Sequence, residues 1–349
     1  MLLVLIAAQS FFFRSAAATA STYRDPLQEK VTSIAPSNAT TEQQGSMVVA
    51  VRPPAASDLA IRKSTEERLA DAWWTGPMLA PSAGGVPKGH LLIEPYFYDV
   101  ASKAADDFGS QTYVVYGLTK RLSVGALTTI GLNRPHHGPA SRSVGLGDQT
   151  LIFQYRLTEF NPSKSWLPTL AFNIQETFPT GRYDNLDRLS DGLGNGAYTT
   201  SVAVYSQAYT RLSNGRLLRM RLNIQASFPG VAPVRNNSVY DTPVGFLGTA
   251  RPGRSYNADL AFEYSLTKRW VLAFDIVAKH IERTRVHGTL VSGTTLQTTT
   301  ARSDLTGVAP AIEYNFSSNY GILLGTRILA GRRSSTFTVT PALAVNCYF

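Results

Sequence analysis

Apolar and polar residues alternate along most of the chain from about residue 88 to its end. Side chains of a β-strand point alternately to opposite faces, so this period of two predicts strands with one apolar and one polar face. In one segment the apolar positions are Leu218, Met220, Leu222, Ile224, Ala226 and Phe228, and the polar ones are Arg219, Arg221, Asn223, Gln225 and Ser227. The same pattern predicts about twelve strands, near residues 89–99, 110–118, 121–132, 146–158, 166–178, 197–211, 216–228, 255–266, 269–282, 306–316, 319–331 and 335–349.

The connections between these strands alternate between short and long. The short ones are residues 118–121, 158–165, 212–215, 266–269 and 316–319. Longer loops are predicted near 100–109, 132–145, 179–196, 229–254 and 283–305, with a tight turn at 331–334. Short turns on one side and long loops on the other are typical of transmembrane β-barrels. An even number of strands would place both ends of the barrel in the periplasm.

The last strand has an apolar face formed by Phe337, Val339, Pro341, Leu343, Val345, Cys347 and Phe349. An unprotected apolar edge strand invites aggregation, and a closed barrel removes the edge by pairing its last strand with its first. The segment resembles the closing strand of bacterial outer-membrane barrels, whose terminal Phe is read by the insertion machinery. Phe349, Val345 and Leu343 are therefore predicted to serve barrel closure and insertion.

A soluble β-sandwich or a large lipocalin-like barrel would show the same alternation with its apolar face inside. Strand length separates these alternatives, because globular strands average about five or six residues whereas membrane-spanning strands need about ten. Twelve long strands also make a barrel too wide for a dry apolar core. The predicted fold is an all-β, antiparallel transmembrane barrel of about twelve strands in the bacterial outer membrane.

The amino-terminal part divides into two predicted segments. Residues 1–20 are expected to be a signal peptide, because residues 1–13 are nearly all apolar and Ala18-Thr19-Ala20 has the small-x-small pattern of a cleavage site. No Lys or Arg precedes the apolar run, which a start codon placed too far downstream would explain. Residues 21–87 are expected to be a flexible periplasmic extension with a short helix over 58–70, beneath the barrel or inside its lumen. Residues 88–349 are the predicted barrel.

The amino-acid composition limits the classes of partner that the chain is expected to bind. The net charge is +9 and the sequence pI about 9.6, but the Lys and Arg residues are scattered rather than clustered on a helix. No nucleic-acid partner is therefore expected, and anionic lipopolysaccharide and outer-membrane lipids suit a basic barrel equally well. Mean hydropathy is −0.07, and Cys347, the single cysteine, allows no internal disulfide and no thiolate metal site.

Charged residues on the polar faces are the candidate site. The predicted inward-facing, pore-lining set is Glu94, Asp148, Arg156, Arg219, Arg221, Asp259, Glu263, Asp275, Lys279, Glu313 and Arg327. Charges on neighbouring strands can sort solutes in a pore; alternatively, they pair and fill the lumen as a salt-bridged plug. Glu176 is the exception, since it shares a face with Leu170 and Phe172. It is expected at the outer interface, or at a bulge that resets the register.

Two other chemistries are weaker alternatives. The loop 180–196 carries three carboxylates among glycines, which suits calcium, but its spacing matches no defined calcium loop and Arg182 and Arg188 could pair with the acids. The loop is expected to be solvated, or to fold inward as a constriction.

A barrel hydrolase would need His280 beside a serine and a third polar residue, and no nucleophile motif is present. No metal, no cofactor and no enzymatic activity are predicted.

Several segments resemble one family, the outer-membrane transporters named for the MetA pathway of phenol degradation. They are residues 73–80, 89–96, 117–125, 145–148, 176–184, 191–199 and 264–270. The resemblance implies a barrel linked to uptake of aromatic compounds, and it transfers no catalytic residue. Trp73, Trp74 and Trp270 are predicted at the membrane interface.

The predicted function is an outer-membrane channel that passes small solutes, with aromatic or hydrophobic compounds as candidates, by passive or facilitated diffusion. The alternatives are a plugged barrel with a structural or adhesive role and an outer-membrane barrel hydrolase. The solute, the oligomeric state and the state of the lumen, open or plugged, stay undetermined at this level.

Overall fold

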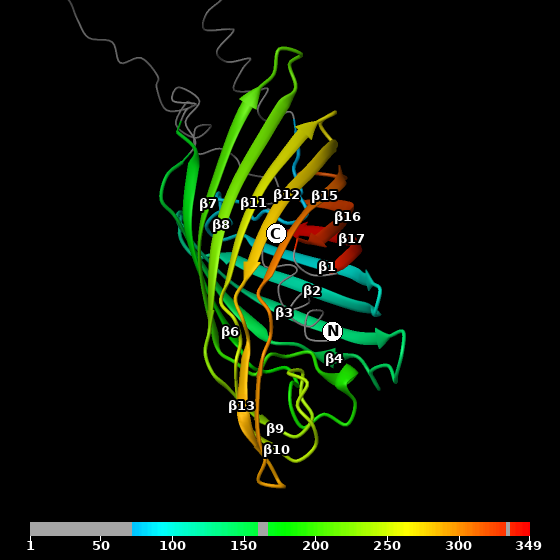
Figure 1. Ribbon diagram of the computed structural model, residues 1–349. Helices are drawn as coiled ribbons and strands as arrows, with labels where there is room; N and C mark the ends of the chain where they lie inside the picture. The colour runs from blue at the N-terminus through cyan, green and yellow to red at the C-terminus, as the bar shows by residue number, and fades with distance from the viewer. Residues whose placement is uncertain (1–71, 160–166, 333–335) are drawn as a thin grey trace, which may run out of the picture.

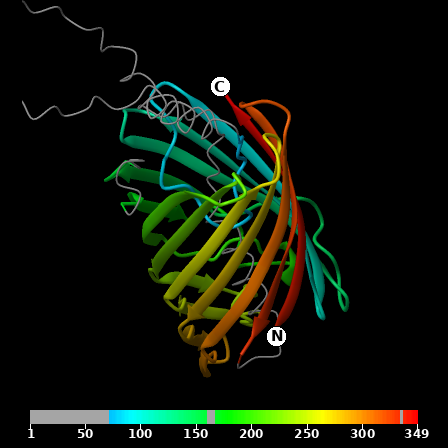
Figure 2. The ribbon, with the colours of Figure 1, turned by 90° about the horizontal axis from the view of Figure 1, so that it is seen from above.

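Twelve long antiparallel strands pair side by side and close into a barrel (Figures 1 and 2). The computed structural model describes residues 72–159, 167–332 and 336–349. The barrel strands are β1 (Leu91–Ser102), β2 (Ala105–Gly117), β3 (Leu122–Pro135), β5 (Gln149–Arg156), β6 (Thr169–Phe178), β7 (Thr199–Arg211), β8 (Leu217–Pro229), β11 (Ser255–Ser265), β12 (Trp270–Ile281), β15 (Ser303–Asn315), β16 (Tyr320–Gly331) and β17 (Phe337–Tyr348). A two-residue strand, β4 (Gly145–Leu146), pairs with β3. The predicted antiparallel barrel of about twelve strands is confirmed, and each predicted strand overlaps an observed one.

The last strand closes the barrel on the first. β17 pairs with β1 from Leu92↔Tyr348 to Ser102↔Thr338. Beyond the strand, the Phe349 N–H donates to the Leu91 carbonyl (2.8 Å) and the Leu91 N–H donates to the Phe349 carbonyl (2.9 Å). Closure leaves no free edge among the twelve strands, as the alternation in β17 predicted. A role of Phe349, Val345 and Leu343 in insertion stays a prediction.

The two faces of each strand carry opposite chemistry. In β12, Leu272, Phe274 and Ile276 are exposed on the outside. Asp275 and Lys279 on the same strand are buried inside. An apolar outer surface with polar side chains inside is the arrangement of a membrane-spanning barrel. Among the residues that the structure describes, no helix has the length and apolar character needed to cross a membrane.

Glu176 does not interrupt the register of β6. β6 pairs with β7 without a break from Thr169↔Gln207 to Thr177↔Thr199. Glu176 lies near the end of β6, and the Thr200 hydroxyl donates a 2.6 Å hydrogen bond to its carboxylate. Of the two explanations for this residue, the position at the outer interface is therefore right.

Three short turns repeat one hydrogen-bonding device. The Thr119 hydroxyl accepts hydrogen bonds from the N–H groups of residues 121 and 122, and the Thr267 hydroxyl accepts them from residues 269 and 270. Ser317 does the same for residues 319 and 320. A hydroxyl that bonds the backbone two or three residues on favours a tight turn. Each hydroxyl therefore pairs two N–H groups of its turn.

The long loops contain more structure than the sequence predicts. A second sheet of four strands consists of β9 (Ala232–Arg235), β10 (Phe246–Arg251), β13 (Arg285–Leu290) and β14 (Thr295–Thr299). It projects beyond the barrel (Figure 1) over an apolar cluster that includes Val234, Tyr240, Phe246 and Val286. These strands lie in segments predicted as loops, because four to six residues are too few for a clear alternation. The predicted loop at 100–109 is instead a tight turn, since β1 and β2 extend to Ser102 and Ala105.

Residues 72–87, here called the lumen segment, lie inside the barrel and not in a flexible periplasmic extension. The Trp73 N–H donates to the carbonyl of Lys268, in the turn between β11 and β12 (2.8 Å). At the other end, Lys88 forms a bridge with Gly117 at the end of β2. A Cβ at Gly117 would lie 1.9 Å from the Pro87 carbonyl oxygen. Only a glycine at this position therefore allows the segment to pass beside the end of β2 as it leaves the lumen. The predicted signal peptide and short helix lie outside the described residues.

A charge on the outer face should destabilise the barrel according to its depth. We expect Ile276→Arg, in the middle of β12, to lower the free energy of unfolding by about 2–4 kcal/mol, because the guanidinium would enter the apolar layer. Val291→Arg is the matched control, since Val291 is 90% exposed in the turn between β13 and β14, and it should change stability by less than about 0.5 kcal/mol. Urea unfolding in lipid vesicles measures both. Equal effects would contradict the assigned membrane-facing surface.

Candidate functional site

Two buried carboxylates hold the lumen segment by its backbone. Asp275 on β12 accepts hydrogen bonds from the N–H groups of Met78 (3.1 Å), Leu79 (3.3 Å) and Ala80 (3.1 Å). Glu313 on β15 accepts one from the Thr75 N–H (2.6 Å). A segment that crosses a lumen outside any sheet must find partners for its N–H groups, and each carboxyl group offers two acceptor oxygens. The carboxylates therefore replace the missing neighbouring strand.

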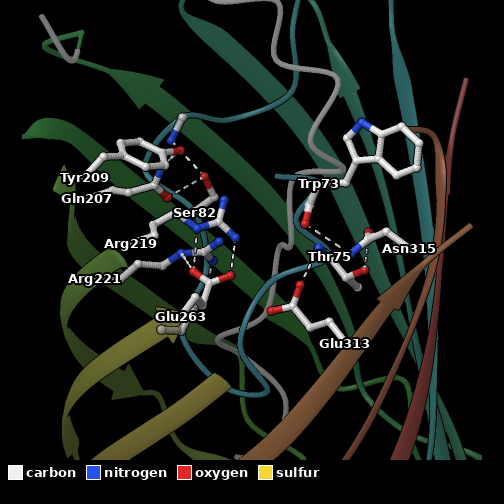
Figure 3. A network of polar contacts seen from close by, with 12 residues as sticks. Trp73, Thr75, Ser82, Gln207, Tyr209, Arg219, Arg221, Glu263, Glu313 and Asn315 are labelled. Atoms are coloured by element: carbon white, nitrogen blue, oxygen red, sulfur yellow. Dashed lines mark hydrogen bonds and ion pairs between the residues drawn. The ribbon is translucent and has the colours of Figure 1, made fainter. Parts of the chain in front are cut away.

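Side-chain donors satisfy the carbonyl groups of the same segment. The carbonyls of Ala80, Pro81 and Ser82 accept hydrogen bonds from Arg221 (2.6 Å), Asn223 (3.0 Å) and Gln154 (2.9 Å). Asn315 donates to the Trp73 carbonyl (3.1 Å), and Ser82 donates to Gln207 (3.0 Å). Figure 3 shows the segment between the side chains of β7 and β8 on one side and β15 on the other. All of these contacts are hydrogen bonds, and the covalent link between the segment and the barrel is the chain itself, which continues through Lys88 into β1.

An ion-pair cluster lies beside the segment. Arg219 and Arg221, both on β8, contact the Glu263 carboxylate on β11, and all three side chains are buried. The Arg219 guanidinium lies 4.6 Å from the centre of the Trp74 ring, which adds a cation–π contact. One shared carboxylate thus holds two guanidinium groups in place.

Only one of the three tryptophans clearly fits the predicted interfacial position. Trp74 is 4% exposed inside the barrel, so its predicted interfacial position is wrong. The burial of the whole lumen segment explains this, because Trp74 moves inside with its backbone. Trp73 lies near Lys268 and Arg269 in a turn. Trp270 is exposed at the start of β12, as expected.

The structure buries all eleven predicted pore-lining residues on the inner side but does not unite them. Six of them, Arg156, Arg219, Arg221, Glu263, Asp275 and Glu313, lie around the lumen segment. Glu94 accepts a hydrogen bond from Asn346, and Arg156 donates to the carbonyls of Gly84 and Lys120 and pairs with Glu159. Asp148 lies at the external end, and the remaining buried members are Asp259, Lys279 and Arg327. The alternative of a salt-bridged plug describes the Arg219–Arg221–Glu263 cluster.

The external loop 179–198 folds inward over the lumen. Asp148 accepts hydrogen bonds from the N–H groups of Gly181 (3.0 Å) and Asn195 (2.9 Å), and Asn133 on β3 donates to the carbonyls of Ser190 and Gly192. The loop therefore folds inward, which was one of the two arrangements predicted for it. Tyr240 also binds the loop, through the Asn195 carbonyl, and burial raises the pKa of this phenol, which keeps it a hydrogen-bond donor.

The acids of this loop pair with groups outside it. Asp184 accepts the Arg235 N–H, and Asp187 forms a 3.2 Å ion pair with Arg142, so pairing with Arg182 and Arg188 is not observed. In residues 72–159, 167–332 and 336–349, no three His, Cys, Asp or Glu side chains gather as a metal ion would require. The carboxylates therefore fasten the loop to neighbouring elements.

Two cavities lie along the wall of the lumen formed by β2, β3, β5 and β6. The outer cavity is narrow and is lined by Tyr98, Asp107, Phe108, Gln111, Leu127, Thr129, Ile130, Gly131, Asn133, Asp148, Thr150, Thr177, Leu193 and Asn195. The inner cavity is narrower still, lies against the lumen segment and is lined by Pro81, Ser82, Gly85, Val86, Leu92, Tyr113, Val115, Ser123, Ile152, Gln154, Asn173, Gln175 and Tyr205. Most of these side chains are uncharged, so the charge pattern of the sequence does not single them out. Their inward positions in the strand alternation are the signal that could have identified them.

Two glutamine oxygens are unpartnered at these cavities. The Gln111 amide N–H donates to Thr129 (3.1 Å), and the Gln175 amide N–H donates to Asn173 (3.0 Å). The carbonyl oxygen of each side chain is buried and has no hydrogen-bond partner among the described residues. An unsatisfied buried acceptor costs about 1–3 kcal/mol.

His280 lies outside the lumen in an acid–base pair without a nucleophile. Its Nδ1 is 2.5 Å from Asp304, and its ring stacks on Tyr256. Within the described part of the chain, no serine hydroxyl makes a hydrogen bond to it. The geometry therefore lacks the nucleophile that the hydrolase alternative needs.

Comparison with known proteins places the chain among outer-membrane barrels. Residues 80–338 match the model of a family described as "Putative MetA-pathway of phenol degradation". The structure is similar to an outer-membrane channel from Pseudomonas putida F1, with a TM-score of 0.55 at 17% identity over 77% of this chain and 98% of that one. KdgM porin (TM-score 0.39, 8% identity, 73% and 99% covered) and NanC porin (0.43, 7%, 73% and 98%) are more distant. No match was found among curated proteins.

Removing the shared carboxylate should destabilise the barrel. We expect Glu263→Gln to lower the free energy of unfolding by about 3–5 kcal/mol, because two buried guanidinium groups would lose their counter-charge. The control is Glu282→Gln at the external rim, which should change it by less than about 0.5 kcal/mol. Urea unfolding of both variants in the same lipid vesicles measures the two free energies of unfolding. A Glu263→Gln barrel as stable as the parent would refute the role given to this ion pair.

Proposed function

The chain belongs to the family of the MetA pathway of phenol degradation, which its model matches over residues 80–338, and from this premise we propose that the protein is an outer-membrane channel for small solutes. The observation that carries the proposal is the lumen itself. It is lined by polar side chains, contains two cavities, and is crossed by a segment held through non-covalent contacts, namely hydrogen bonds and the apolar packing of Met78, Leu79 and Val86. Such a segment can leave its place without breaking a covalent bond.

The proposed mechanism is diffusion past a displaceable constriction. Solute enters beneath loop 179–198, occupies the cavities, and leaves when the lumen segment shifts from Asp275 and Glu313. No energy source is needed, because the solute moves down its gradient. The family description points to aromatic compounds as solutes, and the neutral, partly apolar cavity walls support this choice. A catalytic role is not proposed, since His280 lacks a nucleophile.

A plugged barrel with a structural or adhesive role is the second candidate. The burial of the lumen segment favours it, since residues 77–83 are buried throughout. The external sheet β9–β10–β13–β14 would then be the functional surface. The two candidates differ in whether the lumen segment moves.

The outer-membrane setting supplies two further proposed partners. Arginines cluster at the external rim near β11 to β16, where Arg251 pairs in register with Arg285 and Arg254 lies beside Glu282. This charge suits the phosphates of lipopolysaccharide in the outer leaflet. Phe349, at the end of the closing strand, is the proposed signal for the insertion machinery.

Weakening the hold on the lumen segment should open the channel. We expect Asp275→Asn to raise the open probability about tenfold or more, because the amide has one acceptor oxygen where the carboxyl group has two, so that hydrogen bonds from Met78, or from Leu79 and Ala80, are lost at about 1 kcal/mol or more each. Single-channel recording of the protein in planar bilayers measures this. Asp187→Asn is the matched control, since Asp187 is exposed in the external loop, and it should leave the open probability unchanged.

The same recording separates the two candidate functions. Correctly inserted protein that conducts in neither the parent nor the Asp275→Asn form would refute the channel and favour the plugged barrel. Conductance that rises equally with Asp187→Asn would show that the lumen segment is not the constriction.

A further inference from the structure

Prolines interrupt the backbone pairing of the barrel wall on both sides of one hairpin. Pro95 lies inside β1, Pro310 inside β15 and Pro341 inside β17. In the other nine barrel strands proline is found only at an external end, at Pro135 and Pro229. Proline has no N–H to donate to a neighbouring strand and is therefore rare inside a paired strand. This part of the wall thus differs from the rest in its backbone chemistry.

Two of the prolines weaken the seam that closes the barrel. Leu91 and Phe349 exchange two hydrogen bonds across this seam, and such hydrogen-bonded pairs recur at every second residue of an antiparallel ladder. In the register of β1 with β17, both Pro95 and Pro341 occupy hydrogen-bonded positions, and the ladder has a gap at each. The carbonyl opposite each proline therefore lacks the donor that any other residue would supply.

The third proline weakens the seam between β15 and β16. The Phe316 N–H donates to the Tyr320 carbonyl (2.9 Å), and the same alternation places Pro310 opposite Thr326 at a hydrogen-bonded position. This ladder has a gap at residues 309–310.

The hairpin between these two seams is itself intact. β16 and β17 pair without a break from Tyr320↔Cys347 to Ala330↔Phe337. The other ladders between long barrel strands also run without an internal gap in the described residues. The β16–β17 hairpin, here called the panel, is therefore a continuous unit with an interrupted seam on each side.

The interruptions are costly where they lie. The residues flanking each proline on the inner side are buried, as Thr340 and Ala342 are beside Pro341, so the proline rings face the lipid. A backbone group without a partner is unfavourable in a bilayer because no water can replace the lost bond. Both seams are therefore local weak points in an otherwise continuous wall.

The panel is apolar on both faces around its middle. Leu324 and Leu343 are exposed on the outside. On the inside, the apolar side chains of the panel and of β1 form one cluster with the lumen segment; its members here are Leu323, Ala342, Ala344, Leu92, Tyr96, Met78 and Leu79. The panel and the two weakened seams alone separate this cluster from the lipid.

We propose that the panel parts from β1 and β15 and lets apolar solute pass sideways between the lumen and the lipid layer of the outer membrane. This inference rests on the proposed channel and adds to it a second exit, through the wall, for solutes that dissolve in lipid. The lumen segment takes part, because its Met78 and Leu79 belong to the apolar cluster behind the panel.

Hydrogen exchange of the full chain in lipid nanodiscs, measured by mass spectrometry, tests the panel without any substitution. We expect the amides of β17 and β1 to exchange at least about tenfold faster than those of β11 and β12, because a ladder opens most easily where bonds are missing. The β11–β12 hairpin is the matched control, since both of its neighbouring ladders are continuous. Equal exchange in the two hairpins would overturn the proposal.

A single substitution restores the missing donor. Pro341→Val supplies an N–H opposite Asp99 and keeps an apolar side chain toward the lipid, so it should slow exchange at the closing seam about tenfold. Pro135→Val, at the external end of β3, is the control and should leave that exchange unchanged. Exchange at the seam that is the same in Pro341→Val as in the parent would show that the proline does not weaken it.

A reversible lock tests the route itself. In a Cys347→Ser background, Phe97→Cys with Leu343→Cys joins an opposed pair across the closing seam, within the reach of a disulfide. The probe is N-phenyl-1-naphthylamine, an uncharged aromatic amine that fluoresces in lipid. We expect oxidation to reduce its entry into intact cells to the rate of cells without the protein, and a reductant to restore it. Leu260→Cys with Ile276→Cys, across the continuous β11–β12 ladder, is the control and should have no effect.

The outcomes are separable from those for the channel. A protein that conducts ions and still admits the probe with its seam locked keeps the channel and loses the lateral route. A silent bilayer recording, together with probe entry that the lock abolishes, removes the axial path and keeps the lateral route.

Discussion

A barrel with an apolar exterior turns its polar side chains into the lumen, and every buried polar group there needs a partner. The rest of the structure depends on this constraint. The lumen is too wide for facing walls to satisfy each other, and residues 72–87 supply partners for a part of it. Asp275 and Glu313 bind backbone N–H groups, while Arg221 and Asn223 bind carbonyls. Barrel and segment thus satisfy each other's buried groups.

The lumen has buried charged side chains mainly on β8, β11, β12, β15 and β16 and mostly uncharged ones on β2, β3, β5, β6 and β7, and this division follows from the same constraint. Charged groups are tolerated in the interior only where they are paired or well hydrogen-bonded. The Arg219–Arg221–Glu263 cluster and the carboxylates at the lumen segment meet that condition. The opposite wall has amides and hydroxyls, for which an unmet hydrogen bond costs far less than an unmet charge.

The external end is organised by backbone contacts with buried side chains rather than by loops in solvent. Hydrogen bonds to Asp148 and Asn133 hold loop 179–198 over the lumen, and the glycines of that loop allow its backbone to pack closely. A Cβ at Gly194 would lie 2.4 Å from the Gly181 carbonyl oxygen, so the two chain segments meet only because both positions lack side chains. The β9–β10–β13–β14 sheet and its apolar cluster support this loop from outside.

The sequence by itself determined the barrel: its twelve strands, the inward and outward faces, the short turns and the closing strand. These features are local, because a period of two and a turn-forming Thr or Ser act within a few residues. The sequence also placed the eleven charged residues inside, but it could not say which of them meet. Only the tertiary structure decided that residues 72–87 enter the lumen, that Trp74 lies under Arg219, and that the cavities face uncharged side chains. Those outcomes depend on contacts between residues up to about 240 positions apart, such as Thr75 with Glu313 and Asn315, and no local pattern encodes such a pairing.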